Sequence, residues 1–267
     1  MGAYLLGRRS GLLIAILSVL LIIAFATVYP SRFFTPNTLL QDICRLCSWT
    51  GFLILASITV GSLYEMNRRQ LHDLQNAYVG ILEILSKYLE STDRDTKGHS
   101  VRVSELAMDI AIAMELYRTD VENIRVAGLL HDIGKVEVSG EILRKAADLT
   151  TEEKDEIDKH AEKGAMILSS VGSVLKEVVP IVMAHHEYFS NNENLDNDAL
   201  KERKIPLGAR ILAVADAFDA MTTDRPYRKG MPPWQAREQI MINTGKQFDP
   251  QVVEAFKRVL DKKLETI

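Results

Sequence analysis

Cysteine is scarce in this chain of 267 residues: only Cys44 and Cys47 occur. The rest of the chain has no disulfide framework, which suits a reducing compartment. A redox or metal role and a role as two small apolar residues at a membrane interface both remain open for this pair. Positive charge is not in excess either, since the formal net charge is −4 at pH 7. No nucleic-acid polymer is therefore expected as a partner.

Strand-like alternation of apolar and polar residues is almost absent after residue 86, as are internal repeats and low-complexity segments. Apolar residues instead recur at helical spacing, for example at Val103, Leu106, Ile110 and Met114. Two segments begin with the Thr-x-x-Glu spacing of a capping box, at Thr119 and at Thr150. The expected fold class is all-α, with one helix running from Thr150 through His160.

The first 65 residues contain two long runs without charge. Residues 11–28 and 46–64 each approach the about 20 residues that a helix needs to cross a bilayer. Arginines precede the first run and follow the second, which places both ends in the cytoplasm. We expect residues 1–65 to form a hairpin of two transmembrane helices in the inner membrane, with the rest of the chain in the cytoplasm. A cleaved signal peptide is the alternative for the first run.

Residues 66–86 are expected to form a linker helix with one apolar seam. The seam residues follow 3-4 spacing: Leu71, Leu74, Tyr78, Ile81 and Leu85. A helix with such a seam often pairs with its twin, so a homodimer through this helix is expected. Packing of the seam on the chain's own domain is the alternative. His72 lies among polar residues here and is expected at the surface.

The remaining histidines lie on or next to apolar stripes. His99 stands four residues before Val103, His131 stands four after Ala127, and His160 lies on a stripe with Leu168. The run "VVPIVMAHH" ends in His185 and His186. We therefore expect nearly every histidine after the linker to face inward.

Aspartates also occur in apolar surroundings. Asp132 closes an apolar run, and Asp216 and Asp219 stand within "ILAVADAFDAM". Buried imidazoles and carboxylates need either private hydrogen-bond partners or a shared one, and divalent metals are a shared partner that accepts both. Neighbours such as His131–Asp132 and His185–His186 point about 100° apart on a helix, which favours two adjacent ions over one.

A set of motifs now resembles a known family. Between about residues 80 and 258 the chain carries, in order, "GHS", "LLHDIGK", "HAEKGA", "HHE", "IPLGARILAVADAFDAMTTDRPYR" and "QFDPQVVEAF". This set resembles the HD-GYP domain of the HD phosphohydrolase superfamily. The resemblance implies a helical bundle over residues 87–267 that holds two or three divalent metal ions, usually iron or manganese. It also implies hydrolysis of a cyclic dinucleotide, cyclic di-GMP.

The resemblance also assigns roles to residues. It places metal ligands at His131, Asp132, His160, His185, His186 and Asp216, with Asp132 bridging two ions. His99 matches a ligand of a third ion, whose other ligand in the family is a glutamate at the position of Asp95. The expected mechanism is in-line attack on phosphorus by a metal-bridged hydroxide.

Three basic residues complete the expected site. Lys135 matches a lysine near the scissile phosphate and joins Asp132 as an expected catalytic residue. Arg225 and Arg228 match residues that hold phosphate through their guanidinium groups. Without the resemblance, "DRPYR" reads equally well as a solvated turn.

The chain departs from the family in one loop. The Gly-Tyr-Pro motif after the paired histidines is missing from "HHEYFSNNENLDND", and no glycine follows until Gly208. Because that loop lies beside the substrate in the family, two alternatives stay open. One is a phosphohydrolase that acts on another nucleotide, and the other is a non-catalytic signalling module.

Overall fold

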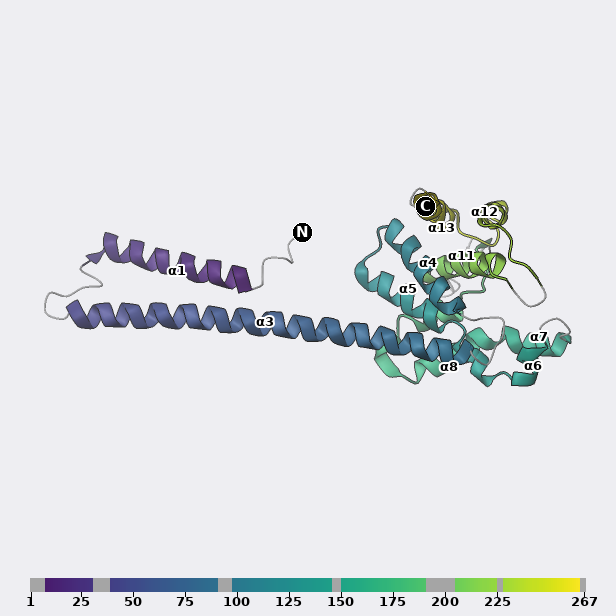
Figure 1. The fold of residues 1–267 in the computed structure, drawn as a ribbon, viewed down its shortest axis with the longest axis horizontal. Coiled ribbons are helices and arrows are strands. Elements are labelled where there is room, and N and C mark those ends of the chain that lie inside the picture. Colours follow the sequence, from purple (N-terminus) through teal and green to yellow (C-terminus); the bar gives the residue numbers. More distant parts are fainter. Residues whose placement is uncertain are drawn as a thin grey trace, which may run out of the picture. The chain divides into compact units, whose positions relative to one another are not determined.

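The computed structural model describes residues 8–30, 39–90, 98–145, 150–190, 205–224 and 228–264 (Figure 1). The chain divides into two compact units, residues 1–78 and residues 79–267. The described residues form helices and no strand, apart from an isolated bridge between Thr244 and Phe248. The predicted all-α class is confirmed.

The first unit is built from α1 (Arg8–Val28) and the greater part of α3 (Leu39–Glu90). Among the described residues, α3 is the one helix long and apolar enough to cross a membrane by length and composition. In α1, residues 15–28 form a shorter apolar stretch. Residues 79–90 of α3 belong to the second unit.

The second unit is a bundle of mostly short helices that follow the end of α3. They are α4 (His99–Ala113), α5 (Arg118–Leu130), the 3-10 turn η2 (Ile133–Glu137), α6 (Gly140–Arg144), α7 (Thr151–Asp158), α8 (His160–Ser169), the 3-10 turn η3 (Gly172–Leu175), α9 (Val179–Met183), α11 (Leu207–Thr222), α12 (Pro233–Ile242) and α13 (Pro250–Leu264).

The core of this unit lies around α4, which packs against α5, α11 and α13. The side chains between these helices are almost wholly buried and aliphatic or aromatic, among them Val103, Ile110, Leu130, Ile211, Leu212 and Phe256. Full burial of one such side chain contributes about 1.5–3 kcal/mol to stability. The helices next to His99, His131 and Asp216 are thus held in place by an apolar core.

One predicted capping box is confirmed and the other is wrong. Thr150 Oγ1 accepts a hydrogen bond from the Glu153 amide, and the Glu153 carboxylate accepts one from the Thr150 amide. At the other predicted capping box, that of Thr119, α5 begins at Arg118 after an extended Tyr117. Thr119 therefore lies inside the first turn, where its side chain cannot act as an N-cap.

The single helix expected through Thr150 and His160 is also corrected. It breaks at Lys159, whose φ of −74° and ψ of −2° separate α7 from α8. His160 consequently stands at the first position of α8 rather than in the middle of a longer helix.

A backbone contact joins η2 to α8. A Cβ atom added to Gly134 would lie 2.0 Å from the His160 carbonyl oxygen and 2.6 Å from the Gly164 amide nitrogen. Both distances are far below van der Waals contact, so only glycine fits here without moving the chain. The contact sets how close the stretch from Asp132 to Lys135 comes to the start of α8.

Candidate metal centre

Five histidines stand at helix ends in the second unit. His99 begins α4, His131 ends α5, and His160 begins α8. His185 and His186 follow α9 in a turn, because that helix ends at Met183. The expectation that His185 and His186 diverge by about 100° on a helix is therefore wrong; their ring centroids lie 3.8 Å apart.

Three of the rings are oriented by their own backbone. The Nδ1 atom of each ring lies within hydrogen-bond distance of the carbonyl three residues earlier: 2.8 Å for His131, 2.6 Å for His160 and 2.6 Å for His185. A carbonyl can only accept, so Nδ1 carries the proton. The Nε2 atom of each ring is left with its lone pair, the arrangement that a metal-binding imidazole has.

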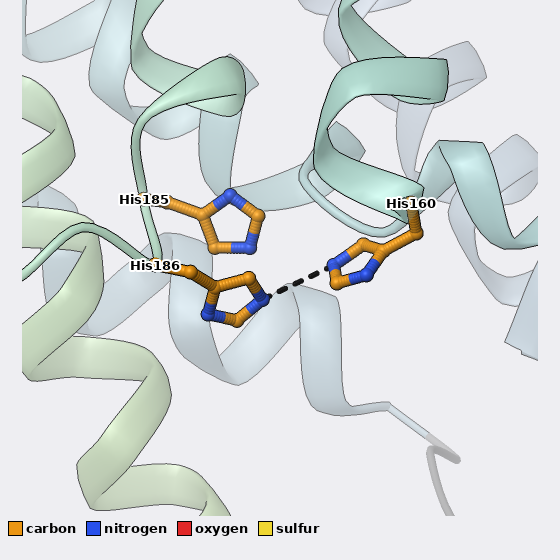
Figure 2. Close-up of side chains that lie close together, drawn as sticks. All are labelled: His160, His185 and His186. Carbon is orange, nitrogen blue, oxygen red and sulfur yellow. Dashed lines mark hydrogen bonds between the residues drawn. The ribbon is translucent and has the colours of Figure 1, made fainter. Parts of the chain in front are cut away.

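His160, His185 and His186 form the first donor group, called here the imidazole group. Their ligand atoms lie within 4.8 Å of one another. In Figure 2 a nitrogen of each ring turns toward the space between them, and the His160 and His186 Nε2 atoms are 3.2 Å apart. The Nε2 atom of His185 is buried and has no hydrogen-bond partner among the described residues. A buried acceptor without a partner is costly unless a ligand meets it.

His99, His131 and Asp216 form the second donor group, called here the mixed group. The His99 Nε2 atom lies 3.3 Å from Asp216 Oδ1, and the His99 and His131 ring centroids are 5.2 Å apart. Figure 1 shows α4 and α11, which carry His99 and Asp216, next to each other. This group therefore joins elements that lie far apart in the sequence.

Asp132 stands between the two groups. Its Oδ1 atom lies 3.5 Å from Nε2 of His160, and its Oδ2 atom lies 3.6 Å from Nε2 of His131. Oδ2 also accepts a hydrogen bond of 2.8 Å from Lys135 Nζ. One carboxylate thus presents one oxygen to each group.

Burial sets the charge of the imidazole group. It lowers the pKa values of His160 and His186, and it lowers that of His185 well below the ordinary value, with the neighbouring His186 adding to the effect. These rings are neutral at pH 7, so His160 and His185, whose Nδ1 atoms donate to carbonyls, each keep an Nε2 lone pair for a ligand.

The carboxylates of the centre are ionised. Burial alone would raise the pKa of Asp132. The Lys135 ammonium and the surrounding imidazoles outweigh this effect and lower the pKa to well below its ordinary value. Burial likewise raises the pKa of Asp216, and its hydrogen bond with His99 outweighs this and lowers it. Each group therefore has an anionic oxygen beside its imidazoles.

His99 behaves differently from the other rings. Burial lowers its pKa, but hydrogen bonds to Asp216 and Asp219 outweigh burial and raise the pKa to about 10. In the metal-free protein, His99 is therefore a cation between two carboxylates. A metal ion that takes the place of the Nε2 proton would face Asp216, while Nδ1 would still donate to Asp219.

These donor sets fit divalent transition metals. Neutral imidazoles and carboxylates are their ordinary ligands, and the unpartnered Nε2 atom of His185 is directed into a space lined by such donors. The outer hydrogen bonds of the rings also fit, because the Nδ1 atoms of His131, His160 and His185 donate to carbonyls and that of His99 donates to a carboxylate.

The other predicted residues fall in different places. Four histidines are buried as expected; His186 is exposed as a whole residue, although its ring lies against the rings of His160 and His185. His72 is exposed, as expected. Arg228 is exposed and donates to the Ala220 carbonyl at 2.6 Å. The predicted Asp95 and Arg225 lie outside the described residues.

Two residues of the centre were not assigned from the sequence. Asp219 is buried, and its Oδ2 atom lies 2.7 Å from His99 Nδ1. Arg102 donates to Asp219 through Nε at 2.6 Å and through Nη2 at 3.0 Å. A partial signal exists for Asp219, which stands one helical turn after Asp216 in an apolar helix. Nothing in the sequence points to Arg102, because its partner lies 117 residues away.

The second unit is thus an all-α domain whose imidazoles and carboxylates gather in two donor groups that could hold metal ions. The sequence model of the HD domain family matches residues 83–252. The chain belongs to this family.

Several characterised relatives share this part of the chain. A cyclic di-GMP phosphodiesterase of Thermotoga maritima is 38% identical over 188 residues, which cover 70% of this chain and 50% of that protein. A cyclic di-GMP phosphodiesterase of Pseudomonas aeruginosa is 39% identical, over a match that covers 63% of this chain and 40% of that protein. A 3′3′-cGAMP-specific phosphodiesterase of Vibrio cholerae is 31% identical, over a match that covers 73% of this chain and 37% of that protein. The chain spans half or less of the length of these relatives.

Proposed function

We propose that this protein is a membrane-anchored, metal-dependent phosphodiesterase that hydrolyses cyclic di-GMP. The observation that carries the proposal is the pair of donor groups that share Asp132. A carboxylate between two donor sets is the arrangement that holds two adjacent ions on one phosphate. The family and the phosphodiesterases among its relatives support the same activity.

His160, His185 and His186 would hold one ion, and His131 and Asp216 would hold the second, with Asp132 between them. Geometry supports adding His99 to the second ion, since its Nε2 atom lies 3.3 Å from Asp216. The resemblance gave His99 to a third ion with Asp95. The mixture of nitrogen and oxygen donors suits iron or manganese.

Bound divalent ions supply an activated water near neutral pH and neutralise charge on the phosphoryl oxygens. The chain's own residues supply the remainder. Asp132 stays ionised and holds the Lys135 ammonium 2.8 Å away, at the edge of the centre. From there Nζ can donate a proton to the departing sugar oxygen. Arg225 and Arg228 would hold phosphate from the stretch after α11.

A second substrate class deserves a direct test. The stretch after His186 lacks the Gly-Tyr-Pro motif of the HD-GYP group, and one of the relatives is specific for 3′3′-cGAMP. This difference favours a cyclic dinucleotide other than cyclic di-GMP as the second candidate.

Anchoring is proposed through a hairpin of α1 and the apolar part of α3 in the inner membrane. The two charge-free runs and the arginines that flank them support two crossings with both ends in the cytoplasm. Of the two helices, α3 is long and apolar enough to span a membrane, whereas the apolar stretch of α1 is shorter. The catalytic domain would then face cytoplasmic nucleotides.

A homodimer is proposed through residues 66–86. The seam residues Leu71, Leu74, Ile81 and Leu85 are exposed and follow heptad spacing along α3. Leu74→Asp should weaken dimers of the detergent-solubilised chain in sedimentation experiments. Gln75→Asp, one residue away and also exposed, should not.

The enzymatic proposal is tested with the full chain, solubilised in detergent, loaded with Fe(II) or Mn(II), and given cyclic di-GMP, 3′3′-cGAMP and a panel of nucleotides. Hydrolysis of cyclic di-GMP is the expected result. Hydrolysis of another compound alone would overturn the substrate, and binding without turnover would indicate a signalling module. Asp132→Asn is the inactive variant, and Asp155→Asn on the exposed face of α7 is its matched control.

A further inference from the structure

The last residue of α3 carries a buried carboxylate. Glu90 is 8% exposed, although glutamate seldom leaves the surface without a partner. Its Oε2 atom accepts a hydrogen bond of 2.5 Å from the Gly98 amide, and its Oε1 atom accepts one of 2.7 Å from the Ser100 amide. The carboxylate of one helix end thus binds the start of the next helix.

The start of α4 depends on this outside partner. Gly98 is the N-cap, has a φ of +72°, and provides no side-chain hydrogen bond to the helix. The first amide groups of a helix lack partners within the helix, and a negative charge there is favourable. Glu90 supplies both the acceptors and the charge.

The two amides that Glu90 binds lie on either side of His99. The His99 ring is held by Asp219 at 2.7 Å and approaches Asp216 at 3.3 Å. The backbone of this residue is therefore held by α3, and its ring is held by α11. Glu90 itself is not a member of either donor group.

We propose that Glu90 is a positioning residue through which the end of α3 sets the place of His99 in the mixed group. The inference rests on the proposed metal-dependent function and adds a means of regulating the same site. A displacement of the last turn of α3 moves the Glu90 carboxylate, the first turn of α4 follows it, and the mixed group loses its geometry. The imidazole group is not joined to Glu90 by any of these bonds.

The test compares Glu90→Gln with the parent chain in detergent by Mn(II) titration, with bound and free ion measured by electron paramagnetic resonance. A neutral amide keeps the size of the side chain but cannot accept from both amides. We expect one of the two ions to bind about 10-fold more weakly, the lower end of the effect of losing an outer partner of a metal ligand. The other ion should bind as before.

Glu83→Gln is the matched control. Glu83 lies two turns earlier on α3, is half-buried, and pairs with Arg125 at 3.4 Å rather than with α4. Both ions should bind to this variant with parent affinity. Glu90→Asp keeps the charge on a shorter side chain and should recover part of the lost affinity. This variant also replaces Glu90→Gln in the test if the glutamine variant does not fold.

A second readout does not depend on metal. Hydrogen exchange of the Gly98, His99 and Ser100 amides should be faster in Glu90→Gln than in the parent, with or without ions. Parent-like binding of both ions, or equal weakening of both, would overturn the positioning role. If the parent itself binds no metal, the proposed function fails, and the exchange result still reports whether Glu90 holds the start of α4.

Discussion

The imidazole group and the mixed group face the same aspartate, yet different parts of the molecule hold them in place. His160 and His185 are oriented by carbonyls of their own chain segment, three residues away. His99 is oriented by Asp219, which lies 120 residues away, and its backbone is held by Glu90. Two rings of the imidazole group are therefore oriented by local backbone, whereas His99 in the mixed group is oriented by contacts from α3 and α11.

The two groups also differ in protonation. The imidazole group is neutral at pH 7 because burial lowers its pKa values. The mixed group includes a protonated His99 between two carboxylates. A metal ion that bound to the mixed group would displace a proton from His99.

The largest effect is expected where the two groups meet. Asp132→Asn removes the anionic oxygen that faces each group, so both ions should be lost together with hydrolysis. The decrease in metal affinity should exceed the about 100-fold that loss of an outer partner causes. Elemental analysis after dialysis measures it. Full metal content with full turnover in this variant would show that Asp132 does not bridge.

Removing one histidine from each group should separate them. His186→Ala should leave only the ion of the mixed group, and His99→Ala should leave only the ion of the imidazole group. Elemental analysis of both variants measures the remaining content. His72→Ala, at an exposed position on α3, is the control and should keep both ions. Identical losses in the first two variants would show that the groups form one inseparable site.

A smaller effect is expected from the outer partner of His99. Asp219→Asn weakens the hydrogen bond that fixes the Nδ1 proton, so the ion of the mixed group should bind about 10-fold more weakly. Mn(II) titration measures this change. Asp224→Asn, an exposed aspartate just after α11, should change neither ion. Weakening of the imidazole group in Asp219→Asn would contradict the separation of the two groups.

The smallest effect is a difference in pH dependence. Because the pKa of His99 is raised to about 10 in the metal-free protein, filling the mixed group at pH 7 should release about one proton from it. Its affinity should rise by up to about tenfold per pH unit between pH 7 and 9 and decline on acidification. Binding to the imidazole group should be nearly flat over this range. Calorimetry in buffers of different ionisation enthalpy measures the released proton, and His99→Ala should abolish the release.

Sequence patterns located most of the centre because its residues interrupt apolar helices. His131 and His160 could be placed on inward faces from helical spacing, and Asp216 was noticeable because it stands inside an apolar run; all three lie in the centre. The Thr150 capping box could also be predicted from the sequence, because every atom in it belongs to four consecutive residues. Local rules predict what local atoms determine.

The missed and mistaken features depend on tertiary structure. Asp219, Arg102 and Glu90 act on partners in other helices, and no sequence spacing encodes those pairings. His185 and His186 are expected on a helix from the sequence, but α9 ends at Met183, two residues before His185. Thr119 met the capping rule, but α5 begins one residue before it.

Gly134 has a consequence for how such a chain can diversify. Because main-chain atoms of η2 and α8 touch at this residue, the spacing between Asp132 and His160 is imposed by the backbone itself. Exchanging side chains in the stretch that follows His186 does not alter that spacing. In the enzyme proposed above, the metal centre can therefore be kept while the residues that would select the nucleotide change.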